Sequence, residues 1–252
     1  MELLKSENFD GISIITLTAG ITNPINPETT DELLTTLTKI SSGNTGYKGL
    51  ILTSANSKFF SIGFDIPKLL LLDRAGLGAF YDAFNELCLK LYSLPMPTLT
   101  AIPGHCIGAG CIIAACTDFR FITPGKTKIG ITATKLRLPV PFLADKIVRQ
   151  VIKNKNADEL LSTGNLYDIN WAKQVGYIDE IQQTVTLFTR VKSFLKKIIN
   201  QSNEEFLKAK EIKINSIRQA YYENKKEDAN NFIDKWFTPK VQTQLKEATK
   251  KY

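Results

Sequence analysis

The chain has 252 residues, of which 43% are hydrophobic and 10% aromatic, a composition typical of a globular protein with a sizeable core. Its net charge of +7 is carried by basic residues interleaved with acidic ones, which is typical of a solvated surface. The longest apolar runs fall far short of the roughly 20 residues that cross a bilayer. These observations exclude a disordered or membrane-spanning chain, and we expect neither nucleic acid nor a membrane as partner.

The first part of the chain alternates strand and helix signals. The β-branched run at residues 12–17 predicts a strand, and a turn rich in Asn and Pro follows at residues 23–27. Thr29 or Thr30 is the expected N-cap of the next helix, whose apolar positions share one face. A second strand is predicted at residues 48–53.

The middle of the chain continues this alternation. Apolar residues at helical spacing predict a helix over residues 78–94, which Pro95 and Pro97 end. The next predicted elements are a strand at residues 98–102, a buried helix at 111–116, a strand at 118–122, and helices at 141–152 and 157–161. Strands that alternate with helices in this way predict an α/β fold.

The character of the sequence changes near residue 188. Strand signals vanish, Lys, Glu, Asn and Gln dominate, and the apolar residues recur at helical intervals up to a stripe at residues 232–237. We therefore predict two regions, an α/β core over residues 1–187 and a C-terminal helical region over residues 188–252. The apolar stripe of the second region requires a covering surface, which predicts a role in oligomerisation and in covering the site.

Cysteine and histidine usage argues against a metal site. Cys106, Cys111 and Cys116 recur every five residues in an apolar stretch, which is not a zinc-site spacing, and His105 is the single histidine. We interpret these cysteines and Cys88 as small buried residues of a reducing compartment. The cysteine and histidine pattern therefore predicts a protein that carries no metal. No secretory or transit segment is visible at the N-terminus, so we expect a cytoplasmic protein.

Two glycine-containing loops, at residues 59–66 and 104–111, each follow a predicted strand. Small residues let a ligand approach the backbone closely, and the first amides of a helix have no partner within it. Two such amides aimed at one point stabilise a developing oxyanion by roughly 2.7–4 kcal/mol per donor. Taken singly, either loop is more often only a tight turn. The second loop is not a dinucleotide-binding fingerprint, because Ile113 stands where the third glycine would be.

The order and spacing of several motifs carry the interpretation further. They are Phe60-Ser61-x-Gly63-x-Asp65, Gly108-Ala109-Gly110-Cys111, Cys116-x-Asp118-x-Arg120, Pro24-Ile25-Asn26, and the segment from Ile129-Gly130 to Pro141-Phe142. Together they resemble the crotonase (enoyl-CoA hydratase/isomerase) superfamily, and most closely its monofunctional Δ3,Δ2-enoyl-CoA isomerase branch. The resemblance implies a crotonase-like α/β spiral of ββα units with a C-terminal helical region, assembled as a homotrimer or homohexamer.

The resemblance also implies a site for an acyl-CoA substrate, with coenzyme A as part of the substrate and no separate cofactor. The backbone amides of Phe64 and Ala109 would form the oxyanion hole for the thioester carbonyl. The positions that the resemblance assigns to substrate binding are Ser61, Gly63, Asp65, Ile66, Lys68, Gly108, Gly110, Ile112 and Leu136. The implied reaction shifts a 3-enoyl-CoA to a 2-enoyl-CoA in fatty-acid metabolism.

The sequence departs from this family where proton transfer is needed. Hydratases place a glutamate at the position of Ile112, and both branches place one at the position of Ala133. A double-bond shift requires a base that takes one proton and returns another, which an alanine methyl group cannot do. Three interpretations follow: a catalytically inactive or repurposed acyl-CoA binder, an engineered alanine, or a substitute base among Asp65, Asp73, Asp145 and Tyr81. We disfavour each of these bases, and we interpret Asp65 as a structural hydrogen-bond acceptor in its loop.

A serine hydrolase is a further alternative, because Ser61 and the single histidine, His105, lie in the two loops. We disfavour it, since the Gly-x-Ser-x-Gly motif is absent and His105 follows a strand-ending glycine. Nucleic-acid binding, suggested by the basic charge, is disfavoured because no aromatic RNA-binding motif is present.

Overall fold

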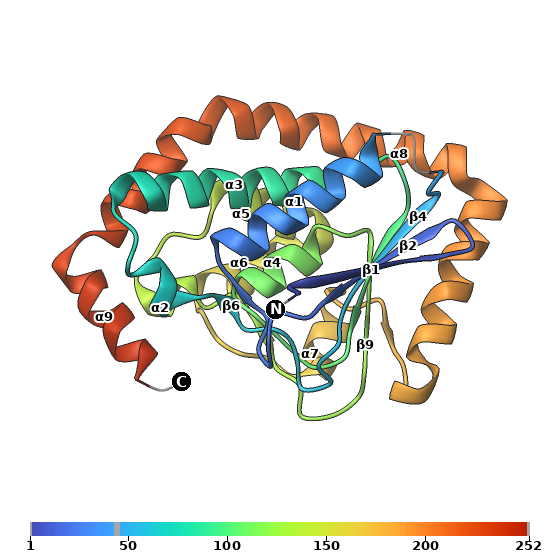
Figure 1. Ribbon diagram of the computed structural model, residues 1–252, viewed down its shortest axis with the longest axis horizontal. Coiled ribbons are helices and arrows are strands. Elements are labelled where there is room, and N and C mark those ends of the chain that lie inside the picture. The colour runs from blue at the N-terminus through green and yellow to red at the C-terminus, as the bar shows by residue number, and fades with distance from the viewer. Residues whose placement is uncertain (1, 43–45, 251–252) are drawn as a thin grey trace.

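The computed structural model describes residues 2–42 and 46–250, and its main sheet has six strands. Figure 1 shows how the helices surround this sheet. The strand order is β1 (Leu4–Phe9), β2 (Ile12–Leu17), β4 (Gly49–Ser54), β7 (Thr98–Ile102), β9 (Phe119–Ile122) and β11 (Glu180–Ile181). Neighbouring strands are parallel except in the β1–β2 hairpin. Residues Leu50, Ile51 and Leu52 of central strand β4 are all buried, as expected for a parallel strand covered on both faces.

Two small sheets lie beyond the main one. The first has the order β10 (Ile129–Gly130), β8 (His105–Ile107) and β5 (Phe59–Ser61), and the second pairs β3 (Pro24–Ile25) with β6 (Gly63–Phe64). All of these pairs are parallel. They join the two predicted glycine-containing loops, because β5 and β6 carry the first loop and β8 carries the second.

Helices surround these sheets. They are α1 (Pro27–Ser41), α2 (Ile66–Leu69), α3 (Arg74–Tyr92), α4 (Ala109–Ala115), the 3-10 helix η1 (Ala133–Leu136), α5 (Phe142–Val151), α6 (Asn154–Ser162), α7 (Ile169–Gln174), α8 (Thr184–Trp236) and α9 (Pro239–Thr249). No helix within the described residues is long and apolar enough to cross a membrane.

The elements predicted in the core are present, with ends that differ by a few residues. The cap of α1 is a correction: Asn26, rather than Thr29 or Thr30, is the N-cap. Its side chain accepts the Thr29 amide at 3.0 Å, and Pro27 follows at the first helical position, where a missing N–H costs nothing. Strand β1 was not predicted, because it is an edge strand whose residues are mostly polar and exposed.

Helix α8 is continuous over 53 residues and spans the whole molecule (Figure 1). Its first half covers one face of the main sheet through Leu187, Val191 and Leu195. Midway, the buried ammonium group of Lys210 donates to Asp118 Oδ2 at 2.8 Å and to the Met96 carbonyl at 3.0 Å. Because α8 begins at residue 184, the helical region starts slightly before the predicted boundary at 187/188. The role of this region in oligomerisation stays a prediction.

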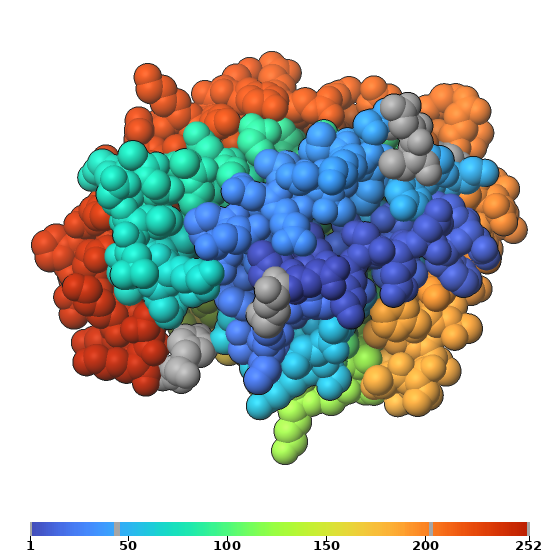
Figure 2. Space-filling model, viewed as in Figure 1, coloured from blue at the N-terminus to red at the C-terminus, as the bar shows by residue number. Residues whose placement is uncertain are grey.

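The C-terminal half of α8 contacts α3 and α5 and is followed by α9. Helix α9 contacts α2 and η1, two short elements far apart in the sequence. Figure 2 shows the atoms of α9 beside those of α2 on one side of the molecule. The last part of the chain therefore closes one end of the α/β core.

Candidate active site

The two predicted loops meet at Gly63 and Ala109. A Cβ atom on Gly63 would lie 2.9 Å from the Ala109 nitrogen and 2.9 Å from the Ile107 carbonyl oxygen, and Gly63 has a φ of +96°. Only glycine fits this position, because a side chain would both clash and strain the backbone. The contact holds the start of α4 against β6.

This contact brings Ala109 against Gly63, the residue that precedes Phe64. Asp65 N donates to Ile25 O at 2.9 Å across the β3–β6 pair. Because successive amides of a strand point to opposite sides, the Phe64 amide points away from β3. Ala109 is the first residue of α4, and the first bond of that helix runs from Ile112 N to Gly108 O at 3.2 Å, so the Ala109 amide has no partner within the helix.

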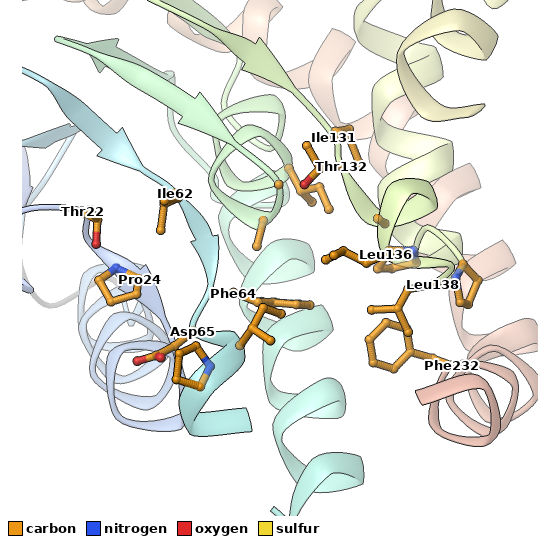
Figure 3. Close-up of a pocket in the computed structure, with 18 residues that line it drawn as sticks. Thr22, Pro24, Ile62, Phe64, Asp65, Ile131, Thr132, Leu136, Leu138 and Phe232 are labelled. Carbon is orange, nitrogen blue, oxygen red and sulfur yellow. The ribbon is translucent and has the colours of Figure 1, made fainter. Parts of the chain in front are cut away.

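Phe64 and Ala109 both line a cavity of about 310 Å³. Its wall contains Thr22, Pro24, Ile62, Phe64, Asp65, Ile66, Pro67, Gly108, Ala109, Ile112, Ile131, Thr132, Ala133, Leu136, Leu138, Pro139, Pro141 and Phe232. In Figure 3, Thr22 and Pro24 lie on one side, Leu138 and Phe232 lie on the other, and Phe64 lies between them. The volume is at the lower end of the range for small-molecule sites, and the wall is mostly apolar, as such sites usually are.

Eight of the predicted site residues line this cavity: Phe64, Asp65, Ile66, Gly108, Ala109, Ile112, Ala133 and Leu136. Three more, Ser61, Gly63 and Gly110, do not line the cavity, but each adjoins in the chain a residue that does. The Ser61 hydroxyl donates to Asn23 O at 2.7 Å and accepts the Gly63 amide at 3.1 Å. A Cβ on Gly110 would lie 2.6 Å from Ser61 Cβ, so this glycine allows α4 to pack on β5.

Lys68 lies at the edge of this region rather than in the wall. Its ammonium group is half exposed and pairs with Glu28 at 3.4 Å. Such an exposed pair contributes little to stability, and a bound anion can displace it at small cost. Lys68 therefore stays a candidate contact for the phosphate groups of a ligand at the cavity mouth.

Asp65 is the single ionisable side chain among the described residues that line the cavity. One carboxylate oxygen caps α2 by accepting the Lys68 amide at 3.3 Å, and the other accepts the Asn26 side-chain amide at 3.1 Å. Both oxygens thus hold the loop together, which gives Asp65 a positioning role instead of the role of a free base.

The other candidate bases lie outside the cavity wall that the described residues form. Asp73 is the N-cap of α3, and Asp145 pairs with Arg149 at 3.0 Å. Tyr81 is buried and donates to Asp228 at 2.7 Å, and burial, followed by the charge of Asp228, strongly raises the pKa of its hydroxyl. The geometry thus gives no support to any of the three as a substitute base.

His105 and Ser61 do not form a nucleophile–base pair. His105 Nδ1 accepts the Lys128 amide at 2.9 Å, whereas the Ser61 hydroxyl donates to a backbone carbonyl. Partial burial, together with the positive charges of Lys58 and Lys128, lowers the pKa of His105. A neutral histidine that supports a loop is the interpretation that these contacts favour.

Phe232 is the wall residue that sequence reasoning missed most completely. It is buried, comes from the far end of α8, and stacks on Tyr81 with ring centroids 4.3 Å apart. Its membership of the apolar stripe at residues 232–237 was visible in the sequence. Its position in the cavity was not, because helical periodicity gives a buried face and not the surface that the face meets.

Asp228 holds this part of α8 through two hydrogen bonds, and we expect it to make stability depend on pH. It accepts the Tyr81 hydroxyl and, at 3.1 Å, the Phe142 amide, yet burial still raises the pKa of its carboxyl group above 3.8. A raised folded-state pKa means that the stability it confers is full below pH 3.8 and is lost as the pH rises through the folded-state pKa. We therefore expect the free energy of unfolding of Asp228→Asn, minus that of the unmodified protein, to be higher at pH 7 than at pH 4. Urea unfolding at both pH values measures this, and a constant difference would contradict it.

A family model described as enoyl-CoA hydratase/isomerase matches residues 7–252. The chain belongs to the enoyl-CoA hydratase/isomerase family. Among curated proteins it is 28% identical over 180 residues to human mitochondrial enoyl-CoA delta isomerase 1, an alignment that covers 71% of this chain and 59% of the human protein. The mouse protein of the same name is 26% identical over 77% of this chain and 68% of its own length.

Solved structures of this family share the fold. The crystal structure of human mitochondrial Δ3-Δ2-enoyl-CoA isomerase matches with a TM-score of 0.94 at 22% identity, over 99% of this chain and 98% of the other. An enoyl-CoA hydratase from Bacillus halodurans matches with a TM-score of 0.86 at 20% identity, over 98% of this chain and all of the other. The predicted membership of the crotonase (enoyl-CoA hydratase/isomerase) superfamily and the crotonase-like α/β fold are thereby confirmed.

Proposed function

We propose that this chain binds acyl-CoA thioesters, with the thioester oxygen on the amides of Phe64 and Ala109. The observation that carries the proposal is that Phe64 on β6 and Ala109 at the start of α4 both line an apolar cavity, and that the Ala109 amide has no partner within its helix. The positive end of the α4 dipole adds to the attraction for a carbonyl that gains negative charge. The acyl chain would extend from this point along Ile112 and Leu136 towards Phe232.

The substrate of the isomerase type that the family membership favours is a 3-enoyl-CoA, converted to a 2-enoyl-CoA. The amides would polarise the thioester and acidify the α-carbon. The proton would then have to move from the α-carbon to the γ-carbon, and the resemblance places the base for this step at Ala133, which lines the cavity. We therefore expect the unmodified chain to bind the substrate and to isomerise it far below the roughly 1–10³ s⁻¹ typical of enzymes.

Binding tests the proposal directly. Isothermal titration with hexanoyl-CoA should give a saturable site, and Gly63→Ala should weaken it at least about tenfold, because the added methyl group would press on the Ala109 nitrogen. Gly20→Ala is the matched control, since that glycine also has a positive φ but no atom lies within 4 Å of an added Cβ. Absence of hexanoyl-CoA binding by the unmodified protein would refute the proposal.

The longest acyl chain that the cavity accepts should depend on Phe232, which lines the cavity on the side away from Thr22 and Pro24. For the unmodified protein we expect affinity to rise with each added CH₂ group, by up to about 0.8 kcal/mol, and then to stop rising when the chain reaches this ring. Phe232→Leu or Phe232→Ala should extend the rise to longer chains. Phe188→Ala, at an exposed position of α8, is the control. The same limiting chain length in all variants would contradict this assignment.

A further inference from the structure

In the proposed function the cavity stabilises a thioester enolate, yet the part of its wall that the structure describes contains no free group that could form one by removing a proton. Ile112 and Ala133, which have no ionisable group, both line the cavity. Both carboxylate oxygens of Asp65 already accept hydrogen bonds, one from the Lys68 amide and one from the Asn26 side chain. An enolate also forms without any base when the bond that breaks at the α-carbon is a bond to a carboxylate. The electron pair of that C–C bond then becomes the enolate pair.

We infer that this cavity decarboxylates α-carboxyacyl thioesters of coenzyme A, that is, malonyl-type thioesters. The inference rests on the proposed function, because it uses the same thioester site and the same two amides. It goes beyond that function because it assigns a reaction to the residues present, and this reaction has no need of the absent glutamate.

The step balances with water as the only co-reactant. The bond between the α-carbon and the carboxylate carbon breaks, CO₂ leaves, and the electron pair passes to the thioester oxygen on the amides of Phe64 and Ala109. The α-carbon of this enolate then takes one proton from water. The hydroxide left behind combines with CO₂ to give bicarbonate, so no electrons are gained or lost overall.

The apolar wall favours this bond cleavage. A carboxylate placed against Ile112, Ile131 and Ala133 loses hydration, whereas the CO₂ that it becomes is neutral and loses little. At the same time the negative charge moves to the thioester oxygen, where the two amide donors would stabilise it. The neutral polar side chains of the described wall are those of Thr22 and Thr132. Their hydroxyl groups can orient the substrate carboxylate. Because they carry no positive charge, they would not stabilise the carboxylate as an ion pair would.

The reaction is tested with malonyl-CoA and methylmalonyl-CoA, followed by chromatographic separation of acetyl-CoA and propionyl-CoA. We expect both products at least about 10²-fold faster than without protein, the effect of about one oxyanion donor. In D₂O each product should carry one solvent deuteron at the α-carbon. Hexanoyl-CoA binding is measured on the same sample. Binding without decarboxylation overturns this inference and leaves the proposed function standing, whereas no binding overturns both.

Variants at residue 133 give opposite expected changes in two reactions. Ala133→Glu should slow decarboxylation roughly tenfold or more, because its carboxylate repels that of the substrate, while it speeds isomerisation of a 3-enoyl-CoA. Ala133→Gln has nearly the same size without the charge and should slow decarboxylation much less. Val185→Glu adds a carboxylate at a position that is 90% exposed, and both rates should stay unchanged. Equal rates of decarboxylation in the Glu and Gln variants would overturn the inference.

Discussion

Ala133→Glu is expected to raise the isomerisation rate of trans-3-hexenoyl-CoA by about 10²–10⁴-fold, the usual contribution of general acid–base catalysis. Residue 133 begins η1, is half-buried and lines the cavity that Phe64 and Ala109 also line. A glutamate here would face the substrate next to the enolate that these amides stabilise. The absorbance of the conjugated 2-enoyl thioester follows the reaction.

The surroundings of residue 133 should also tune the new carboxyl group. Most of its neighbours in the wall, such as Ile131 and Leu136, are apolar, and desolvation raises the pKa of a carboxylic acid. A base with a raised pKa is better matched to proton transfer near neutral pH. The activity of Ala133→Glu should therefore increase with pH and level off above the pKa of this group.

Ala133→Gln is the control, because it fills the same space and cannot carry the proton. It should remain as slow as the unmodified chain in this assay. Robust turnover by the unmodified chain would show that another group moves the proton, and the assignment of residue 133 would then fall. An Ala133→Glu variant that folds and binds hexanoyl-CoA but stays inactive would contradict the predicted path of the substrate.

The loops of the site were predictable because their signals are local. Gly63 and Gly110 stand out in the sequence, and each permits a backbone approach that a Cβ would block, to Ala109 N in one case and to Ser61 in the other. The buried parallel strands were likewise predictable from short apolar runs such as that of β4. Patterns within a few residues of each other thus gave the core and one wall of the cavity.

What escaped prediction depends on contacts between distant segments. Phe232 reaches the cavity because α8 crosses the molecule and Tyr81 stacks on its ring. The structural role of Asp65 was predicted, but its hydrogen-bond partner Asn26, which comes from another element, was not. The polar edge strand β1 lacks alternating apolar residues because pairing with β2, and not burial, fixes it. Each of these required the tertiary structure.

Ala109→Pro is expected to lower the turnover of the Ala133→Glu variant by about 10²–10³-fold, the usual effect of losing one oxyanion donor. A backbone donor is normally beyond the reach of mutation. Here it is accessible because residue 109 is the first residue of α4, where proline is well tolerated and its missing N–H leaves no helical bond unmade. The preceding residue is Gly108, whose missing Cβ relieves the restriction that proline places on its neighbour.

The same substitution should also abolish most of the decarboxylation of malonyl-CoA, because both reactions pass through one enolate held by one pair of amides. Ala109→Gly keeps the N–H and serves as the matched control, with both rates expected within a few-fold of the parent protein. Circular dichroism and thermal unfolding establish that the proline variant is folded. A folded Ala109→Pro protein with full activity would mean that the thioester oxygen lies elsewhere. Loss of one reaction alone would mean that the two substrates do not share this site.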